Sequence, residues 1–165
     1  GLKVFGEKPS PHLTALAEVG ADGDELGWRR FLEHSRRIFD EHGAVWLVHW
    51  TPYERTQVRK YVEKYGDPTG TAARVLESLY DLHPVVQGSL VIPLPSYGLK
   101  LVEQVAGYER RMPEAGGKWS MATYIEAVET ADPARAAELI GDIVRYNEED
   151  LDALWAVYHW LRRMK

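Results

Sequence analysis

The sequence predicts an α/β domain in which a mixed sheet is flanked by helices and the C-terminal half is helical. Three observations lead to this fold class. Short apolar runs typical of strands lie only in the first half, helical spacings follow them after short turns, and the pattern from Met121 onward is helical. The 165 residues, 45% hydrophobic and 27% charged, suit one compact domain with a core of ordinary size.

The chain opens with two predicted strands and a helix. Residues 2–5 alternate in the manner of a strand, residues 13–19 form a second strand, and the glycine and prolines between them indicate a turn. Asp22 and Glu25 then make a capping-box pattern. Apolar residues at helical spacing follow it, and Gly43 ends them, which predicts the first helix.

The next segment has the order strand, turn, helix. Residues 44–48 are a continuous apolar run that is too short for a helix, as in a buried central strand of a parallel or mixed sheet. Thr51 and Pro52 begin a helix that closes at Gly66. A further helix and a short extended piece at 81–83 come after it.

The second half is predicted to be irregular first and helical afterwards. Prolines in and just before residues 87–97 interrupt regular structure, which predicts an irregular connection leading into a helix near 96–106. Asp132 and Pro133 have the pattern of a cap and first turn, so we expect one alanine-rich helix through Ile143 and a separate last helix. The six tryptophans are expected mostly in the core, with two near loops where a base could stack: Trp28, Trp46, Trp155 and Trp160 in the core, Trp50 and Trp119 near loops.

Composition limits the function. There are no cysteines, so any metal must be held by oxygen or imidazole ligands. The net charge of −5 argues against a protein that coats nucleic acid by charge alone, but carboxylates that bind cations are compatible with a nuclease. Basic pairs such as Arg110–Arg111 are interpreted as solvated helix faces. With no apolar run that could span a bilayer and no leader pattern, we expect a cytoplasmic protein without a membrane partner.

Tyr146 and Asp150 are the first candidate pair for chemistry. Two residues four positions apart on a helix point to the same side, so the acid could hold a cation while the tyrosine hydroxyl orients the attacking water. The alternative is that Asn147 caps the last helix and the acids beside it only complement the helix dipole.

His49 and Glu54 are the second candidate pair, at the point where a buried strand ends and a helix begins. Open α/β sheets tend to bind ligands at this place, and Glu54 would be a metal-holding carboxylate. Two alternatives stay open. Thr51 and Glu54 also fit a capping box, and His49 fits a hydrogen-bonded histidine without a chemical role. Asp81 is interpreted as a turn or strand-end aspartate.

Taken in order, these pieces resemble the RNase H-like domain of the YprB-type, predicted RecB-associated nuclease family. This family is a branch of the DnaQ-like (DEDD) exonucleases with a tyrosine in the third motif, and the resemblance covers nearly the whole chain. Its second motif corresponds to His49, Tyr53 and Glu54, and its third motif to Tyr146 and Asp150. Two connecting segments also resemble those of the family: DLH at 81–83 and SYGLK at 96–100.

The resemblance implies a metal-dependent 3′–5′ exonuclease in DNA repair or processing, acting on single-stranded DNA rather than RNA. It implies two divalent cations, Mg²⁺ or Mn²⁺, held about 4 Å apart by carboxylates. Asp150 and Glu54 would be metal ligands, Tyr146 would position the water, and His49 would contact phosphate or tune a nearby acid. Fused or associated nuclease or helicase domains are the implied protein partners.

The chain departs from the family at the first motif. The family carries Asp-x-Glu on its opening strand, which is absent here, and residues 2–5 resemble the strand that follows it. We therefore expect residues 1–165 to be a single domain cut from a longer protein, lacking the first strand and nearly inactive alone. The alternatives are a natural degenerate domain, a non-catalytic nucleic-acid or protein-binding module of the same fold, and a helical domain whose acids only cap helices.

Overall fold

The computed structural model describes residues 1–6, 9–17 and 22–164. Helices dominate this part of the chain, and the strands are very short. In chain order the described elements are β1 (Leu2–Lys3), β2 (His12–Leu13), α1 (Gly23–His42), β3 (Leu47–His49), α2 (Tyr53–Tyr65), α3 (Thr71–Ser78), β4 (Leu79–Asp81), α4 (Leu82–Ser89), α5 (Leu99–Val105), α6 (Gly117–Glu129) and α7 (Pro133–Arg163). The expected combination of strands and helices with a helical second half is confirmed, but the described strands form two separate two-stranded sheets and not the expected single mixed sheet.

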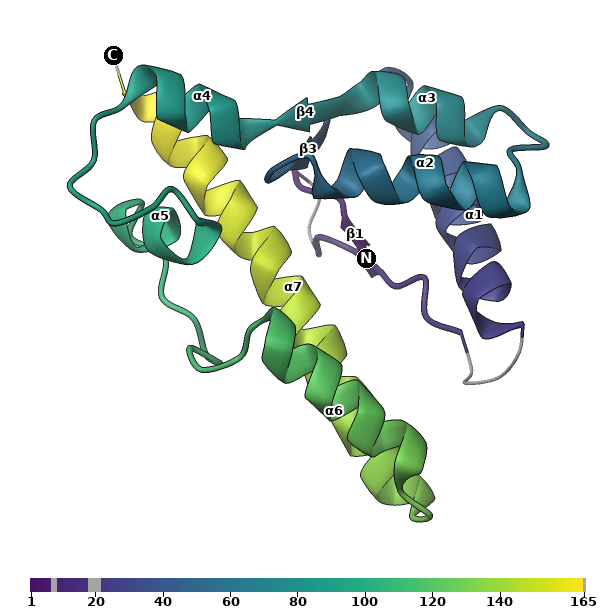
Figure 1. Cartoon of the computed structure of the whole chain (residues 1–165). Helices are drawn as coiled ribbons and strands as arrows, with labels where there is room; N and C mark the ends of the chain where they lie inside the picture. The colour runs from purple at the N-terminus through teal and green to yellow at the C-terminus, as the bar shows by residue number, and fades with distance from the viewer. Residues whose placement is uncertain (7–8, 18–21, 165) are drawn as a thin grey trace.

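The helices form two groups joined by β3 and β4 (Figure 1). On one side α1, α2 and α3 pack together. On the other side the long helix α7 runs diagonally, with α6 against its N-terminal half and α4 and α5 near its C-terminal half. The strand pair lies between the groups, so side chains at the ends of its strands can reach the space in front of α7.

The parallel pair of β3 and β4 sets the position of the site. Leu47 pairs with Leu79 and His49 pairs with Asp81. Because parallel strands end at the same edge, His49 and Asp81 lie side by side at the carboxyl edge. The strand expected at 44–48 is confirmed in a parallel pair, but it begins only at Leu47. It is not the expected buried central strand, because Leu47 and Val48 are half-buried and β4 is its one partner among the described residues.

Apolar side chains form two clusters on the two sides of β3, because neighbouring residues of a strand point to opposite faces. Leu47 packs with the first cluster and Val48 with the second. The buried members of the first cluster come from α1, α2 and α3: Trp28, Leu32, Phe39, Val58, Ala72 and Val75. Those of the second come from Trp50 and from α4, α5 and α7: Trp50, Leu82, Val86, Val102, Leu154 and Val157.

The N-terminal hairpin of β1 and β2 is fastened to α7. The strand predicted at residues 2–5 is confirmed over Leu2–Lys3, and it pairs antiparallel with β2. The Nζ atom of Lys3 lies 2.8 Å from Glu148 Oε1 and 2.7 Å from Asp152 Oδ1, and the Phe5 ring stacks on Trp155 with centroids 4.4 Å apart. The predicted second strand at 13–19 is shorter, and its last residues lie outside the described part of the chain.

One predicted helix boundary is wrong, and one predicted side-chain cap does not form although its helix begins at the expected residue. Residues 133–163 form one continuous helix instead of two, so Asn147 is an interior helical residue and not a cap. Its amide oxygen lies 3.2 Å from His12 Nε2. The cap at Asp132 is confirmed, because its Oδ1 accepts from Ala134 N at 2.9 Å. The capping box at Asp22 does not form, since its side chain makes no cap bond and Glu25 pairs with Arg29 instead.

Helix α4 was not predicted, because its proline favoured an irregular segment. Residues 87–89 were expected in an irregular connection, but they end this helix. Pro84 lies in its first turn, where a backbone N–H has no partner within the helix, so the proline costs little. Asp81 begins the helix by accepting from His83 N at 2.9 Å.

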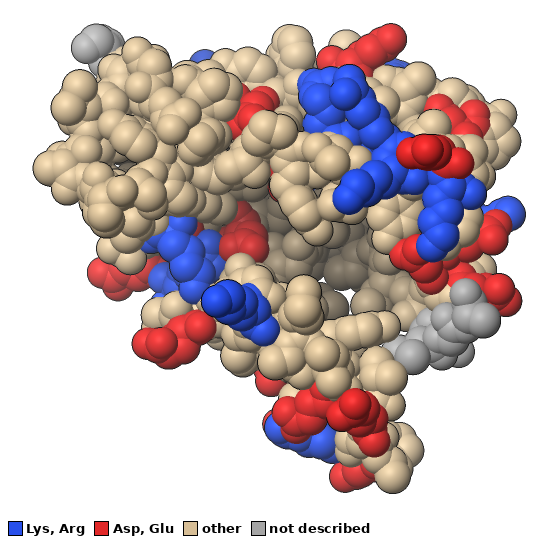
Figure 2. Space-filling view, viewed as in Figure 1, with Lys and Arg blue, Asp and Glu red and all other residues tan. Residues whose placement is uncertain are grey.

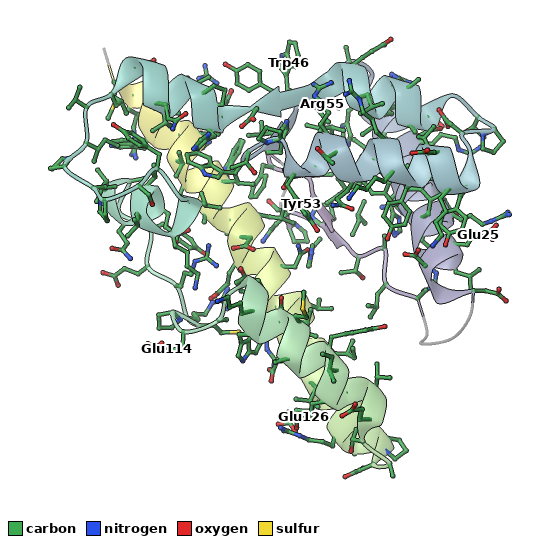
Figure 3. The ribbon with its side chains drawn as sticks, in the orientation of Figure 1. Glu25, Trp46, Tyr53, Arg55, Glu114 and Glu126 are labelled. Atoms are coloured by element: carbon green, nitrogen blue, oxygen red, sulfur yellow. The ribbon has the colours of Figure 1, made fainter. Side chains whose placement is uncertain are left out.

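Two of the six tryptophans differ from the prediction, one in each direction. Trp46 was expected in the core but is 71% exposed, and Figure 3 shows it projecting beyond β4. Trp50 was expected near a loop but is buried, and its Nε1–H donates to the Tyr97 carbonyl oxygen at 3.2 Å. The strand starts later than predicted, which leaves Trp46 before the sheet. In the described residues, no helix is long and apolar enough to cross a membrane.

Candidate active site

A cavity of about 1500 Å³ separates the β3 edge from α7. Figure 2 shows it as a hollow near the centre of the face, with mostly uncharged atoms in its floor and charged side chains at its rim. One wall holds His49 and Glu54, and the opposite wall holds Tyr146 and Asp150. All four residues that the sequence singled out therefore line the same space.

The first wall of the cavity includes a turn at the end of β3 that hydrogen bonds hold in place. Thr51 has a φ of 71°, which is rare for a residue with a branched side chain. Its carbonyl oxygen accepts from His49 Nδ1 at 2.8 Å, and its N–H donates to Asp81 Oδ1 at 3.0 Å. Asp81 is thus the strand-end aspartate that the sequence predicts, and it also fixes the turn that carries His49.

Glu54 lies in the first turn of α2 and is directed at His49. Its Oε2 atom lies 3.3 Å from His49 Nδ1, but that nitrogen gives its hydrogen to Thr51. Among the residues that the structure describes, Oε2 is therefore buried without a hydrogen-bond donor. The alternative role of Glu54 in a capping box is not found, because α2 begins without a side-chain cap. A buried carboxylate oxygen without a donor calls for a ligand such as a cation.

The imidazole of His49 is 5% exposed and lies among negative charge. Burial lowers its pKa, but Glu54, the Thr51 carbonyl oxygen and Asp81 outweigh burial, so the pKa of His49 is raised. The geometry assigns the Nδ1 hydrogen to Thr51, so Glu54 acts mainly as a neighbouring negative charge. A histidine in this position can carry a positive charge toward a phosphate.

The second wall is one face of α7. Tyr146 and Asp150 lie one helical turn apart in the middle of the helix, which removes the alternative that they belong to a helix cap. Burial, followed by the charge of Asp150, raises the pKa of Tyr146 to about 12, so the phenol keeps its proton. The indole of Trp119 packs edge-on against the Tyr146 ring, with centroids 5.8 Å apart.

The acids next to Asp150 have structural partners. Glu148 and Asp152 both pair with Lys3. Glu149 is 3% exposed and accepts from the backbone N–H groups of Arg111 at 2.7 Å and Met112 at 3.2 Å. These bonds attach the loop between α5 and α6 to α7. Asp150 is thus the acid of this run that faces the cavity with Tyr146.

Arg110 is a site residue that the sequence reasoning missed. It was interpreted with Arg111 as part of a solvated face, but its side chain is 4% exposed whereas that of Arg111 is 82% exposed. Its Nη2 atom lies 2.7 Å from Asp150 Oδ1. Glu103 of α5 holds the same guanidinium through two hydrogen bonds of 2.6 and 2.8 Å. Nothing local in the sequence distinguishes these two arginines.

The carboxylate oxygens at this cavity are of the type that a hard divalent cation binds. Glu54 and Asp150 offer carboxylate oxygens, which Mg²⁺ and Mn²⁺ prefer, and Oε2 of Glu54 has no hydrogen-bond partner in the described part of the chain. They do not make a complete site. Within the described ranges, no three His, Asp or Glu side chains are grouped so that they could hold a metal ion. The two walls could therefore supply only part of the ligand set that a divalent cation needs.

The chain also matches a known protein family. A family model described as the RNase H superfamily matches residues 11–162. The chain therefore belongs to the RNase H superfamily, whose domains are nucleic-acid hydrolases that commonly use divalent metals. No curated protein and no solved structure matches the chain.

Proposed function

We propose that this chain carries part of the active site of a metal-dependent 3′–5′ exonuclease that degrades single-stranded DNA in repair or processing. The observation that carries the proposal is the cavity, because it places the His49–Glu54 wall opposite the Tyr146–Asp150 wall. Membership of the RNase H superfamily supports hydrolysis of nucleic acid in general. The polarity, the substrate and the pathway are parts of the proposal.

Glu54 and Asp150 are proposed as the metal ligands of this chain, with Mg²⁺ or Mn²⁺ as the ion. The chemistry supplied by bound cations is the activation of water at neutral pH and the neutralisation of charge on the phosphate. Tyr146 keeps its proton, so its hydroxyl can donate to or orient the attacking water. His49, held by Thr51, can direct positive charge toward a phosphate oxygen.

A further strand is proposed to complete both the sheet and the site. Among the described residues, β3 pairs with β4 alone and β1 pairs with β2 alone, so both strands have a free edge. The cavity is lined by residues of β1 and β3. Unpaired edges beside an apolar cavity are suited to an added strand. If that strand carried two carboxylates near His49, it would supply the ligands that the two walls lack.

We therefore propose that residues 1–165 form a single domain belonging to a longer cytoplasmic protein, with nuclease or helicase domains fused to it or associated with it. In this proposal the isolated chain has little or no nuclease activity. The extended chain, defined here as the chain with the residues encoded immediately upstream of Gly1, is the form that should be active.

The experiment is digestion of labelled oligonucleotides by the extended chain. With Mn²⁺ present, we expect single nucleotides to be released from the 3′ end of single-stranded DNA, and 3′- and 5′-labelled substrates separate the two polarities. Matched RNA and duplex substrates test the proposed preference. The absence of metal-dependent hydrolysis of every substrate by a folded extended chain would reject the proposed function.

A second candidate is a binding module of the same fold without catalysis. The observation in its favour is that the described residues hold no complete group of metal ligands. Such a module would bind single-stranded nucleic acid without added metal, and its affinity would fall steeply with salt because binding releases counterions. Salt-dependent binding that Mn²⁺ does not change, together with no hydrolysis by the extended chain, would favour this candidate.

A further inference from the structure

The position of Arg110 is fixed by a buried carboxylate. Glu103 is 2% exposed on α5, and it takes the Nε and Nη2 hydrogens of Arg110 in a two-bond arrangement. Such a paired contact sets the plane of the guanidinium as well as its distance. Arg110 therefore presents its remaining donors in defined directions although it lies in a loop between helices.

The same guanidinium reaches both functional residues of α7. Its Nη2 atom lies 2.7 Å from Asp150 Oδ1, and its Cζ atom lies 5.7 Å from the centre of the Tyr146 ring. Burial opposes the charge of Arg110, but Glu103 and Asp150 outweigh it, so the pKa of Arg110 is raised and it stays protonated. Asp150 is thus neutralised by an internal cation in this structure.

One nitrogen of Arg110 lacks an acceptor. Nη1 is buried and makes no hydrogen bond within the described residues. A buried arginine with a purely structural role has its donors satisfied, because an unpaired buried donor is costly.

The two carboxylates around Arg110 also outnumber it in charge, so the cluster of Glu103, Arg110 and Asp150 can still attract a cation.

We propose that Arg110 is a positioning residue that holds the Asp150 carboxylate, and that a divalent cation must compete with Arg110 for this ligand. The inference rests on the proposed function, in which Asp150 is a metal ligand. Glu103 then sets how strongly Arg110 competes. Without the Glu103 charge, Arg110 would bind Asp150 more strongly, and without Arg110, Asp150 would be available to the cation.

The test measures Mn²⁺ binding by the full 165-residue chain, using the electron paramagnetic resonance signal of free Mn²⁺. The main variant is Glu103→Gln/Arg110→Met, which removes the buried pair as a unit and leaves no buried charge unpaired. Glu103→Gln alone keeps Arg110 and nearly the same shape. Arg111→Met is the matched control, because its exposed side chain is the neighbouring cation. Circular dichroism establishes that each variant is folded.

The double variant should bind Mn²⁺ several-fold more tightly, because Arg110 contacts Asp150 directly whereas the Glu103 charge removed with it lies behind Arg110. Glu103→Gln should bind Mn²⁺ more weakly than the unchanged chain, and Arg111→Met should bind it equally. If the double variant does not fold, Glu103→Gln alone decides. Affinities of both Glu103 variants equal to that of the unchanged chain, including no detectable binding by any of them, would overturn the inference.

Failure of this inference is distinguishable from failure of the proposed function. Adding Asp150→Asn to the double variant should abolish its tighter binding, because the carboxylate ligand is gone. If the tighter binding persists, the gained ion is held elsewhere and the inference is overturned. Hydrolysis by the extended chain without any Arg110 effect would reject only the positioning role.

Discussion

Oε2 of Glu54 lies 3.3 Å from Nδ1 of His49 and receives no hydrogen from it, because Nδ1 donates to the carbonyl oxygen of Thr51. The strand-end turn thus holds the imidazole and leaves one carboxylate oxygen free. A histidine and a glutamate five positions apart meet in this way only because Thr51 adopts a left-handed conformation between them.

Replacing Glu54 by glutamine should lower the pKa of His49. Glu54 helps to raise this pKa against the effect of burial, and the neutral amide would no longer do so. A raised folded-state pKa stabilises the fold below the unfolded value and loses this effect as the pH rises through the folded value. Glu54→Gln should therefore destabilise more at pH 5 than at pH 9, by under about 1 kcal/mol because Glu54 is partly exposed.

The measurement is a pH titration of the histidine ring protons by NMR, together with urea unfolding at both pH values. His159, which is exposed on α7, serves as the internal reference. An unchanged His49 titration in the variant would mean that the Glu54 charge does not act on this imidazole.

Asp24 should stabilise the contact between α1 and α2 in a pH-dependent way. Its carboxylate accepts from Lys64 Nζ at 2.8 Å and from the hydroxyls of Tyr61 at 2.5 Å and Tyr65 at 2.9 Å, which lowers its pKa to about 2. A lowered folded-state pKa stabilises the fold above the unfolded value, and this effect is lost as the pH falls from about 4 to about 2.

Asp24→Asn should thus cost about 1 kcal/mol at pH 7, after allowance for solvent exposure, and much less at pH 2. Urea unfolding at the two pH values measures the difference. Asp40→Asn is the matched control, because Asp40 is exposed on the same helix. A cost for Asp24→Asn that does not change with pH would contradict the assignment of its pKa.

Glu149 and Asp150 are neighbours for which we propose different roles, so their amide variants should separate stability from metal binding. Glu149→Gln weakens two charged hydrogen bonds to backbone N–H groups and should destabilise the fold by about 1.5–3 kcal/mol. Asp150→Asn should cost less, because Asp150 is 32% exposed and Arg110 keeps its bonds to Glu103. Only Asp150→Asn should remove Mn²⁺ binding. The opposite ranking in urea unfolding would show that Asp150 is the structural acid.

The hydroxyl of Tyr146 is expected to matter for the chemical step. Tyr146→Phe in the extended chain should lower kcat about 10²-fold with little change in KM, because the water loses its partner while the ring packing stays. The variant should also lack one phenol that titrates near pH 12 in ultraviolet absorbance. Tyr80→Phe, at a tyrosine on β4, is the control. Full activity of Tyr146→Phe would remove Tyr146 from the mechanism.

Local sequence patterns were sufficient to predict helix ends that are marked by a glycine stop or an aspartate cap. Gly43 and Gly66 end α1 and α2 where the sequence predicts, and Asp132 caps α7 as expected. The continuity of α7 through Asn147 could not be read locally, because asparagine is a common cap. Its side chain is engaged by His12, a residue more than a hundred positions away.

The candidate site was predictable where motif order could be used, and not where partners come from the fold. Tyr146 and Asp150 were singled out by their helical spacing together with their order after His49 and Glu54. The latter two were singled out by their place after a strand. Arg110 could not be predicted, because its burial depends on Glu103 of α5 and Asp150 of α7, which only the folded chain brings together.

The most direct test of the central claim is Mn²⁺-dependent digestion of 3′-labelled single-stranded DNA by the extended chain and by its Asp150→Asn variant. We predict release of the labelled nucleotide by the unchanged extended chain, none without metal, and none above background for an Asp150→Asn variant shown to be folded. Digestion by Asp150→Asn at the rate of the unchanged chain would contradict the assignment of this active site.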